Sequence, residues 1–242
     1  RAAVHGLSFQ VKPGETVAIV GPSGAGKSTV FSLILRFYDP ESGRIVIDGV
    51  DVREADPAAV RERIAIVPQD VTIFAASARD NIAFGLKFAG RRPRKYIWWG
   101  EETTVPWVLR TPESILGLIG LSAQADLPAA AITPSQQRLL EIGMALATRP
   151  RMLLLDEVAA GLTENEVEEM ARLIRRLRDE LDLTVVWIEH AVTTLLRHVE
   201  RVIVLHQGKK IADGTPAEVV RNAEVIEAYL GDEMNETEEA AA

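Results

Sequence analysis

The stretch Gly21-Pro22-Ser23-Gly24-Ala25-Gly26-Lys27-Ser28-Thr29 fits the pattern G-x-x-x-x-G-K-[ST] at every fixed position. Residues 15–20 before it form a β-branched apolar run typical of a buried strand, and residues 28–35 after it have the pattern of a helix. Strand, loop and helix in this order predict a loop that binds nucleotide phosphates. The alternative is a glycine turn before an ordinary helix, and the completeness of the motif argues against it.

The residue types in this loop suit phosphate chemistry. Glycines let consecutive backbone N–H groups approach phosphate oxygens, and the N-terminus of the following helix adds its positive dipole end. Lys27 supplies a mobile positive charge for the β- and γ-phosphates, and the Ser28 hydroxyl is a hard oxygen ligand for Mg²⁺. The loop therefore predicts binding of a nucleotide with its metal.

Composition limits the class of protein. The chain has 242 residues, 47% hydrophobic and 26% charged, which is ordinary for a globular protein with a sizeable core. Its net charge of −8 argues against nucleic acid as the main partner, and the absence of cysteine excludes a disulfide framework. No run approaches the ~20 apolar residues that span a bilayer. Because the chain begins at Arg1 rather than Met, we expect a fragment of something longer.

Polar side chains follow three more apolar runs that read as buried strands. Gln69 follows residues 64–67, Asp156 and Glu157 end the run from Arg151, and His190 ends the run from Leu183. Ligands of an open α/β sheet bind beyond the carboxyl ends of its strands. After a phosphate loop, Asp156 is expected near Mg²⁺ and Glu157 near a reacting water. The alternatives are a plain loop amide, an ordinary acidic strand end and a structural histidine.

Turn and periodicity signals predict the remaining elements. Helix 164–181 has an apolar stripe formed by Val167, Met170, Leu173, Ile174 and Leu177. The other expected elements are a strand at 6–11, a hairpin at 44–52 with an Asp-Gly turn, a helix at 58–63, strands at 201–205 and 210–212 around a Gln207-Gly208 turn, two short helices, and a frayed acidic tail.

From Ser77 to about Ala130 the β-branched runs disappear and short helical segments are expected. Within this part, residues 91–99 join a basic cluster to aromatics and either contact a membrane or its partner, or form a solvated loop held by buried tryptophans. Thr133, Pro134 and Gln136 predict a capping box at the start of a helix reaching Ala147, and such an N-terminus also suits an anion.

Together these motifs resemble the nucleotide-binding subunit or domain of an ABC transporter over nearly the whole chain. The family's Walker A motif, Q-loop, Walker B motif, catalytic glutamate and switch histidine correspond to residues 21–29, Gln69, residues 152–156, Glu157 and His190, in the family's order. Residues 21–85 resemble the exporter type, whereas the part after about Leu116 is similar to the ATPases of branched-chain amino acid importers. The cargo and the direction of transport stay open.

The resemblance implies an α/β fold, a P-loop NTPase core with a mostly parallel sheet, an N-terminal antiparallel β portion and an inserted helical subdomain. The core corresponds to residues 1–76 and 151–231, the helical signature subdomain to 77–150 and a flexible tail to 232–242. It also implies a homo- or heterodimer of ATPase domains coupled to a transmembrane subunit or domain at the cytoplasmic face of the membrane.

The resemblance implies ATP hydrolysis with ATP and Mg²⁺ bound. Glu157 would polarise the attacking water, His190 would orient it, and Gln69 would join Ser28 and Asp156 at the metal. The implied nucleotide contacts are Gly21, Ser23, Gly24, Ala25, Gly26, Lys27, Ser28 and Thr29 of one subunit, with Thr133, Ser135 and Gln136 of the other.

The signature motif departs from the family pattern Leu-Ser-Gly-Gly-Gln and reads Ile132-Thr133-Pro134-Ser135-Gln136. Pro134 removes one backbone N–H, and Ser135 adds bulk where the backbone should approach phosphate. Loss of one or two charge-assisted hydrogen bonds, each about 1.5–3 kcal/mol, would slow turnover by one to several orders of magnitude. The alternative function is a regulatory module that binds nucleotide with little turnover.

Overall fold

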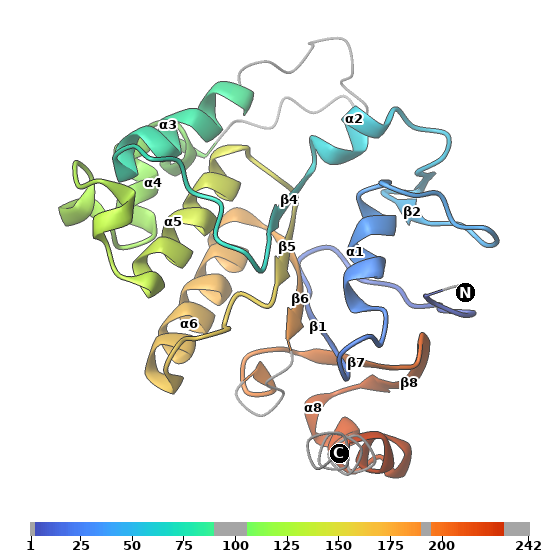
Figure 1. The fold of residues 1–242 in the computed structure, drawn as a ribbon. Helices are drawn as coiled ribbons and strands as arrows, with labels where there is room; N and C mark the ends of the chain where they lie inside the picture. The colour runs from blue at the N-terminus through green and yellow to red at the C-terminus, as the bar shows by residue number, and fades with distance from the viewer. Residues whose placement is uncertain (1–2, 90–105, 190–194, 230–242) are drawn as a thin grey trace, which may run out of the picture.

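A six-stranded sheet in the order β4-β5-β6-β1-β7-β8 lies at the centre of the chain (Figure 1). The structure is a computed structural model that describes residues 3–89, 106–189 and 195–229. All neighbouring strands are parallel except β8, which is antiparallel to β7. The strands are β1 (Thr16–Val20), β4 (Ile64–Val67), β5 (Met152–Asp156), β6 (Thr184–Glu189), β7 (Arg201–His206) and β8 (Lys209–Gly214). The predicted α/β class with a mostly parallel sheet is confirmed.

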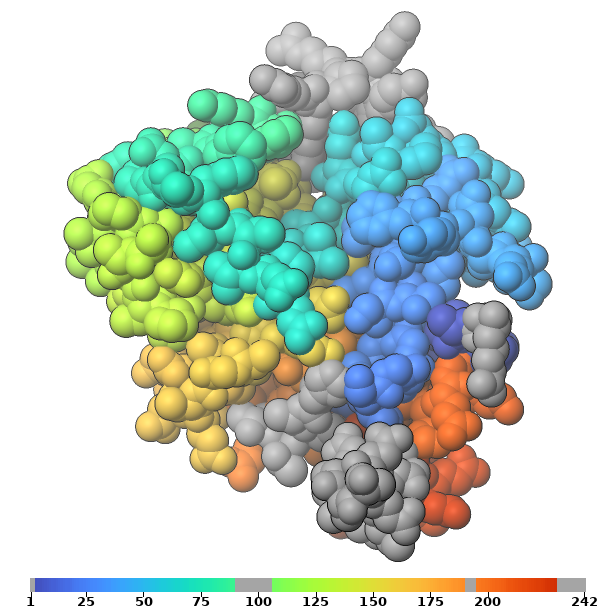
Figure 2. All heavy atoms as spheres, in the orientation of Figure 1, coloured from blue at the N-terminus to red at the C-terminus, as the bar shows by residue number. Residues whose placement is uncertain are grey.

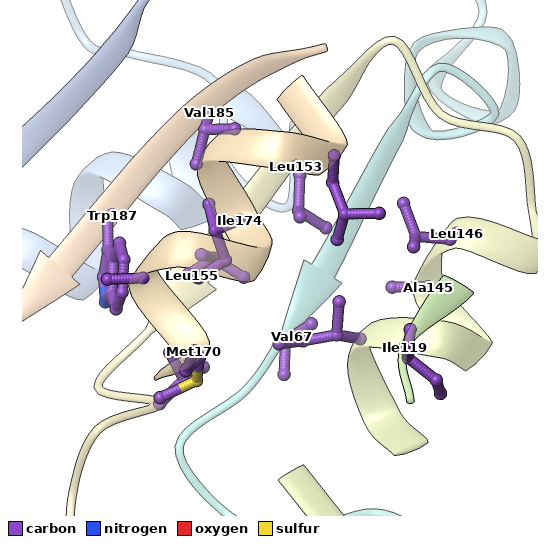
Figure 3. Packing of buried hydrophobic residues seen from close by; sticks show 14 of the residues in the cluster. Val67, Ile119, Ala145, Leu146, Leu153, Leu155, Met170, Ile174, Val185 and Trp187 are labelled. Atoms are coloured by element: carbon purple, nitrogen blue, oxygen red, sulfur yellow. The ribbon is translucent and has the colours of Figure 1, made fainter. Parts of the chain in front are cut away.

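Helices cover both faces of the sheet, so its strands are apolar on both sides. In β1, Val17 and Ile19 face a core shared with helices α1 (Lys27–Ile34) and α2 (Pro57–Arg61). Ala18 and Val20 face the opposite core, which α6 (Glu164–Leu181) and the helices between β4 and β5 complete. Figure 3 shows this second core, where Trp187 and Leu155 of the sheet meet Met170 and Ile174 of α6.

Helices make up most of the described part of the chain between Ser77 and Ala147, as the loss of β-branched runs from Ser77 predicts. The longest elements there are α3 (Ala78–Ala89), α4 (Pro112–Leu118) and α5 (Pro134–Ala147), and α5 packs against α3, α4 and β4. Three short 3-10 helices join them, η1 (Trp107–Leu109), η2 (Ser122–Gln124) and η3 (Ala129–Ala131). The predicted basic and aromatic segment at 91–99 lies outside the described residues.

The N-terminal β structure is smaller than predicted. The hairpin is confirmed as β2 (Val46–Ile47) and β3 (Val50–Asp51), with Asp48 and Gly49 both at positive φ as a two-residue turn requires. The predicted strand at 6–11 is wrong, since these residues form no ladder. Leu7, Phe9 and Val11 nevertheless pack against the core at alternate positions. The alternating apolar residues pack on the core, but the segment is not a strand because no neighbouring strand pairs with its backbone.

The C-terminal half follows the sequence pattern closely. Helix α6 buries Val167, Met170, Ile174 and Leu177 of the predicted stripe. After the β7–β8 turn, α8 (Pro216–Val219) and residues 223–229 are helical, as expected. In the part of the chain that the structure describes, no helix has both the length and the hydropathy needed to cross a membrane.

Candidate active site

The carboxyl ends of four parallel strands meet at one edge of the sheet and bring most of the predicted residues together. The register pairs Val20 of β1 with Glu189 of β6, and Asp156 of β5 with Ile188 of β6. Gly21 follows β1 directly, and Gln69 lies two residues beyond the end of β4. His190, the predicted switch histidine, lies outside the described residues.

The phosphate loop connects β1 to α1 in a conformation that requires glycine. Gly21 has φ 155°, and a Cβ atom there would lie 2.1 Å from the Leu205 carbonyl oxygen on β7. Gly26, the N-cap of α1, has φ 99°, a left-handed conformation that L side chains rarely adopt. The loop is therefore packed directly onto the sheet, and Ser23, Gly24 and Ser28 are left exposed at its outer side.

Lys27 folds back into the loop that precedes it. Its Nζ atom donates hydrogen bonds to the Gly21 oxygen at 2.7 Å and the Pro22 oxygen at 3.0 Å, and the residue is 5% exposed. Burial lowers the pKa of Lys27, while the nearby carboxylates of Glu157, Asp156 and Glu189 oppose that shift. The ammonium group thus lies in the field of the acidic residues that end β5 and β6.

Glu157 begins a tight turn after β5 and is 8% exposed. Its φ of 51° is left-handed, and its N–H donates to the Ile188 oxygen of β6 at 2.9 Å. The Glu157 oxygen in turn accepts from the Ala160 N–H at 3.2 Å. The backbone of the predicted catalytic glutamate is therefore anchored to the neighbouring strand.

The predicted signature residues lie at the start of α5. Thr133 is the N-cap, and the capping box is confirmed by the Gln136 N–H to Thr133 Oγ1 contact at 3.3 Å and its reciprocal at 3.1 Å. The hydroxyls of Thr133 and Ser135 lie 3.1 Å apart, and Pro134 occupies the first turn without an N–H. The helix N-terminus is formed, but with fewer backbone donors than a glycine-containing signature would offer.

A buried ion pair on α5, which sequence reasoning missed, holds the loop that carries Gln69. Arg138 donates to the Pro68 oxygen at 2.9 Å, to the Gln69 oxygen at 2.7 Å and to Glu141 Oε2 at 2.8 Å. Glu141 Oε1 accepts from the Thr72 N–H at 2.5 Å. Burial raises the pKa of Glu141, and the bonds from Thr72 and the charge of Arg138 counteract it. We call this pair the α5 clamp.

Two sequence signals point to such residues in hindsight. Arg138 and Glu141 are charged residues three apart, and they fall among the apolar positions of α5 rather than on a polar face. Glu189 is an acidic residue at the end of an otherwise apolar strand. A charge on a buried face needs a partner, so both positions carry a signal for an internal contact that the sequence analysis did not use.

Comparison with known proteins identifies the family of the chain. Residues 4–160 match the family model described as "ABC transporter", and residues 209–234 match the model described as "Branched-chain amino acid ATP-binding cassette transporter". The high-affinity branched-chain amino acid transport ATP-binding protein BraF of Pseudomonas aeruginosa is 33% identical over 95% of this chain and 92% of its own length. The ABC multidrug transporter MDR2 of Trichophyton tonsurans is 34% identical over 94% of this chain, which spans 16% of that relative.

A solved structure agrees on the fold. The structure of cbiO1 from Clostridium perfringens, described as part of the ABC transporter complex cbiONQ, superimposes with a TM-score of 0.79 at 28% identity and covers 93% of this chain and 86% of its own. The chain therefore belongs to the ABC transporter family, as one of its ATP-binding and ATP-hydrolysing subunits or domains.

Proposed function

We propose that hydrolysis takes place at the sheet edge where β1 and β5 end, with Lys27 and Glu157 as its central groups. The observation that carries the proposal is the position of the Lys27 ammonium in the field of Asp156 and Glu157. The Lys27 ammonium donates hydrogen bonds to the carbonyls of its own loop, and a bound γ-phosphate would accept hydrogen bonds from it in their place. Glu157 would polarise the attacking water, and His190 would orient it.

We propose a Mg²⁺ ion bound by Ser28, Gln69 and Asp156. A hydroxyl, an amide oxygen and a carboxylate are the hard oxygen ligands that Mg²⁺ prefers, and the residues therefore fit this ion. Within the described ranges no three acidic or histidine side chains cluster in a way that could hold a metal. The nucleotide phosphates would accordingly complete the coordination, and the ion would neutralise charge that develops on them.

The signature residues would act on the nucleotide of a second ATPase chain. Thr133 would offer its hydroxyl, Gln136 its side chain and the start of α5 its dipole to the partner's γ-phosphate. Pro134 and Ser135 would weaken that contact, so we expect slow turnover rather than none. The supporting observation is that the helix N-terminus is intact and capped despite the altered motif.

A mixing experiment tests this head-to-tail arrangement. Lys27→Ala disables the phosphate loop, and Ser135→Glu places a negative charge at the signature, so each variant alone should lack activity. In a mixture, the heterodimer would combine one intact loop with one intact signature and regain part of the wild-type rate. An active wild type with no recovery in the mixture would contradict a site shared between two chains.

We propose that different parts of the chain have different roles. Residues 1–76 and 151–231 would form the nucleotide-binding core, residues 77–150 the helical part that carries the signature, and 232–242 a tail.

The transmembrane partner would place the protein at the cytoplasmic face of the membrane. An apolar groove of about 690 Å³ lies between α2, β4 and α3 (Figure 2). The side chains of Phe74, Phe84 and Phe88 line it, so it suits such a partner. Each of these rings is at least 38% exposed.

We also propose that the cargo class is branched-chain amino acids taken up by the cell. The importer relative BraF matches this chain along 92% of its length, whereas the multidrug transporter MDR2 matches along 16%. The C-terminal match at 209–234 supports the same branch. Cells that carry Lys27→Ala in place of the wild-type chain should lose concentrative uptake of radiolabelled leucine, and unchanged uptake would contradict this assignment.

A further inference from the structure

Glu189 is a buried acidic residue between the two halves of the active site. It ends β6, is 4% exposed, and pairs in register with Val20, which immediately precedes the phosphate loop. On the other side, β6 lies beside β5, the strand that ends in Asp156. Burial of a carboxylate is costly unless hydrogen bonds compensate for the lost water. The hydrogen-bond partners of Glu189 therefore indicate its role.

One oxygen of Glu189 receives two donors. Its Oε1 atom accepts from the indole Nε1 of Trp187 at 3.0 Å and from the backbone N–H of Ala159 at 2.8 Å. Trp187 is 1% exposed and packs in the core of the sheet (Figure 3), so its ring fixes the carboxylate from within β6. The second contact reaches across to the turn that follows Glu157.

That turn needs external support because it begins in an unfavourable conformation. Glu157 has φ 51°, and a left-handed backbone is unfavourable for a residue other than glycine. Hydrogen bonds tie the turn to β6 from the Glu157 N–H to the Ile188 oxygen at 2.9 Å and from the Ala159 N–H to Glu189. Only the second tie depends on a side chain, and it can be removed by substitution.

We propose that Glu189 is a positioning residue for Glu157. The Trp187 indole fixes the Glu189 carboxylate, and that carboxylate accepts the hydrogen bond from Ala159. In this way Glu189 keeps the turn closed against β6 and keeps the Glu157 carboxylate directed at the nucleotide. The inference rests on the proposed role of Glu157 in polarising water. It concerns how that carboxylate is held and adds no group that touches the substrate.

Three variants of the full chain test the proposal: Glu189→Ala, Glu189→Gln and Trp187→Phe. Steady-state hydrolysis of Mg²⁺-ATP gives kcat and KM, and a fluorescent ATP analogue gives nucleotide affinity. Glu189→Ala should lower kcat by about 10-fold or more, because the hydrogen bond that ties the Ala159 N–H to a charged group is lost. Its affinity for ATP should match that of Glu189→Gln within about threefold, since both variants remove the Glu189 charge near Lys27. Glu189→Gln should retain most of kcat, because an amide oxygen accepts the same two donors.

Trp187→Phe removes one donor and should give an intermediate loss of kcat; it also serves as the test if Glu189→Ala does not fold. An unchanged kcat in Glu189→Ala, or a glutamine variant as impaired as the alanine variant, would overturn the inference. Full activity of Glu157→Gln alone would instead refute the proposed role of Glu157.

Discussion

Removal of Arg138 from the α5 clamp should destabilise the protein strongly. The side chains of Arg138 and Glu141 are 7% and 3% exposed, and three hydrogen bonds from the guanidinium end on Pro68, Gln69 and Glu141. Arg138→Met keeps most of the side-chain volume but leaves a buried carboxylate without its counter-charge. Breaking a buried pair in this way costs about 3–5 kcal/mol, a large share of the roughly 5–15 kcal/mol that stabilises a typical domain.

The assay is urea unfolding followed by circular dichroism at neutral pH. A matched double variant, Arg138→Met with Glu141→Leu, has no buried charge left and should recover a large part of the loss. It should not recover turnover, because the loop that carries Gln69 would still lack both of its donors from Arg138. A loss below about 1 kcal/mol in Arg138→Met would refute the reasoning, as would a double variant less stable than the single one.

Three further predictions concern other parts of the chain. Gly21→Ala should abolish binding of a fluorescent ATP analogue, because its Cβ would lie 2.1 Å from the Leu205 oxygen; retained binding would contradict the loop geometry. Thr133→Ala should cost about 1 kcal/mol in urea unfolding through the lost N-cap, and no change would argue against the capping box. Hydrogen bonds from Arg201 lower the pKa of Asp213 below its ordinary value of 3.8, so Asp213→Asn should destabilise the protein at neutral pH. That difference should be full above the ordinary pKa of 3.8 and should decrease as the pH falls below it toward the lowered pKa of the folded protein; a difference that does not change between pH 7 and pH 2 would contradict it.

The sequence predicted the elements whose signals are local. Burial on both faces makes β1 and β5 continuous apolar runs, and the capping box at Thr133 lies within four consecutive residues. The segment at 6–11 shows the limit of such signals. Its alternating side chains pack on the core, but a strand also requires a neighbour with free backbone groups, and no local pattern reveals one.

The candidate site divides in the same way. The phosphate loop and the Asp156-Glu157 pair are contiguous in sequence, and the parallel sheet explains why they meet. The residues that hold these groups in place are far from them in the sequence. Arg138 donates to a loop about 70 residues earlier, and Glu189 accepts from Ala159, which lies 30 residues earlier. Only the folded chain identifies such partners, because many arrangements of the same helices and strands would satisfy a buried charge.

Turnover of Mg²⁺-ATP by the wild-type chain beside Glu157→Gln and Lys27→Ala tests the central claim most directly. We predict wild-type activity that rises more than linearly with protein concentration, because the site needs two chains. Glu157→Gln should bind ATP without turning it over, and Lys27→Ala should lose binding. A wild type that binds ATP yet hydrolyses it no faster than Glu157→Gln would contradict the proposal that Glu157 drives hydrolysis at this site.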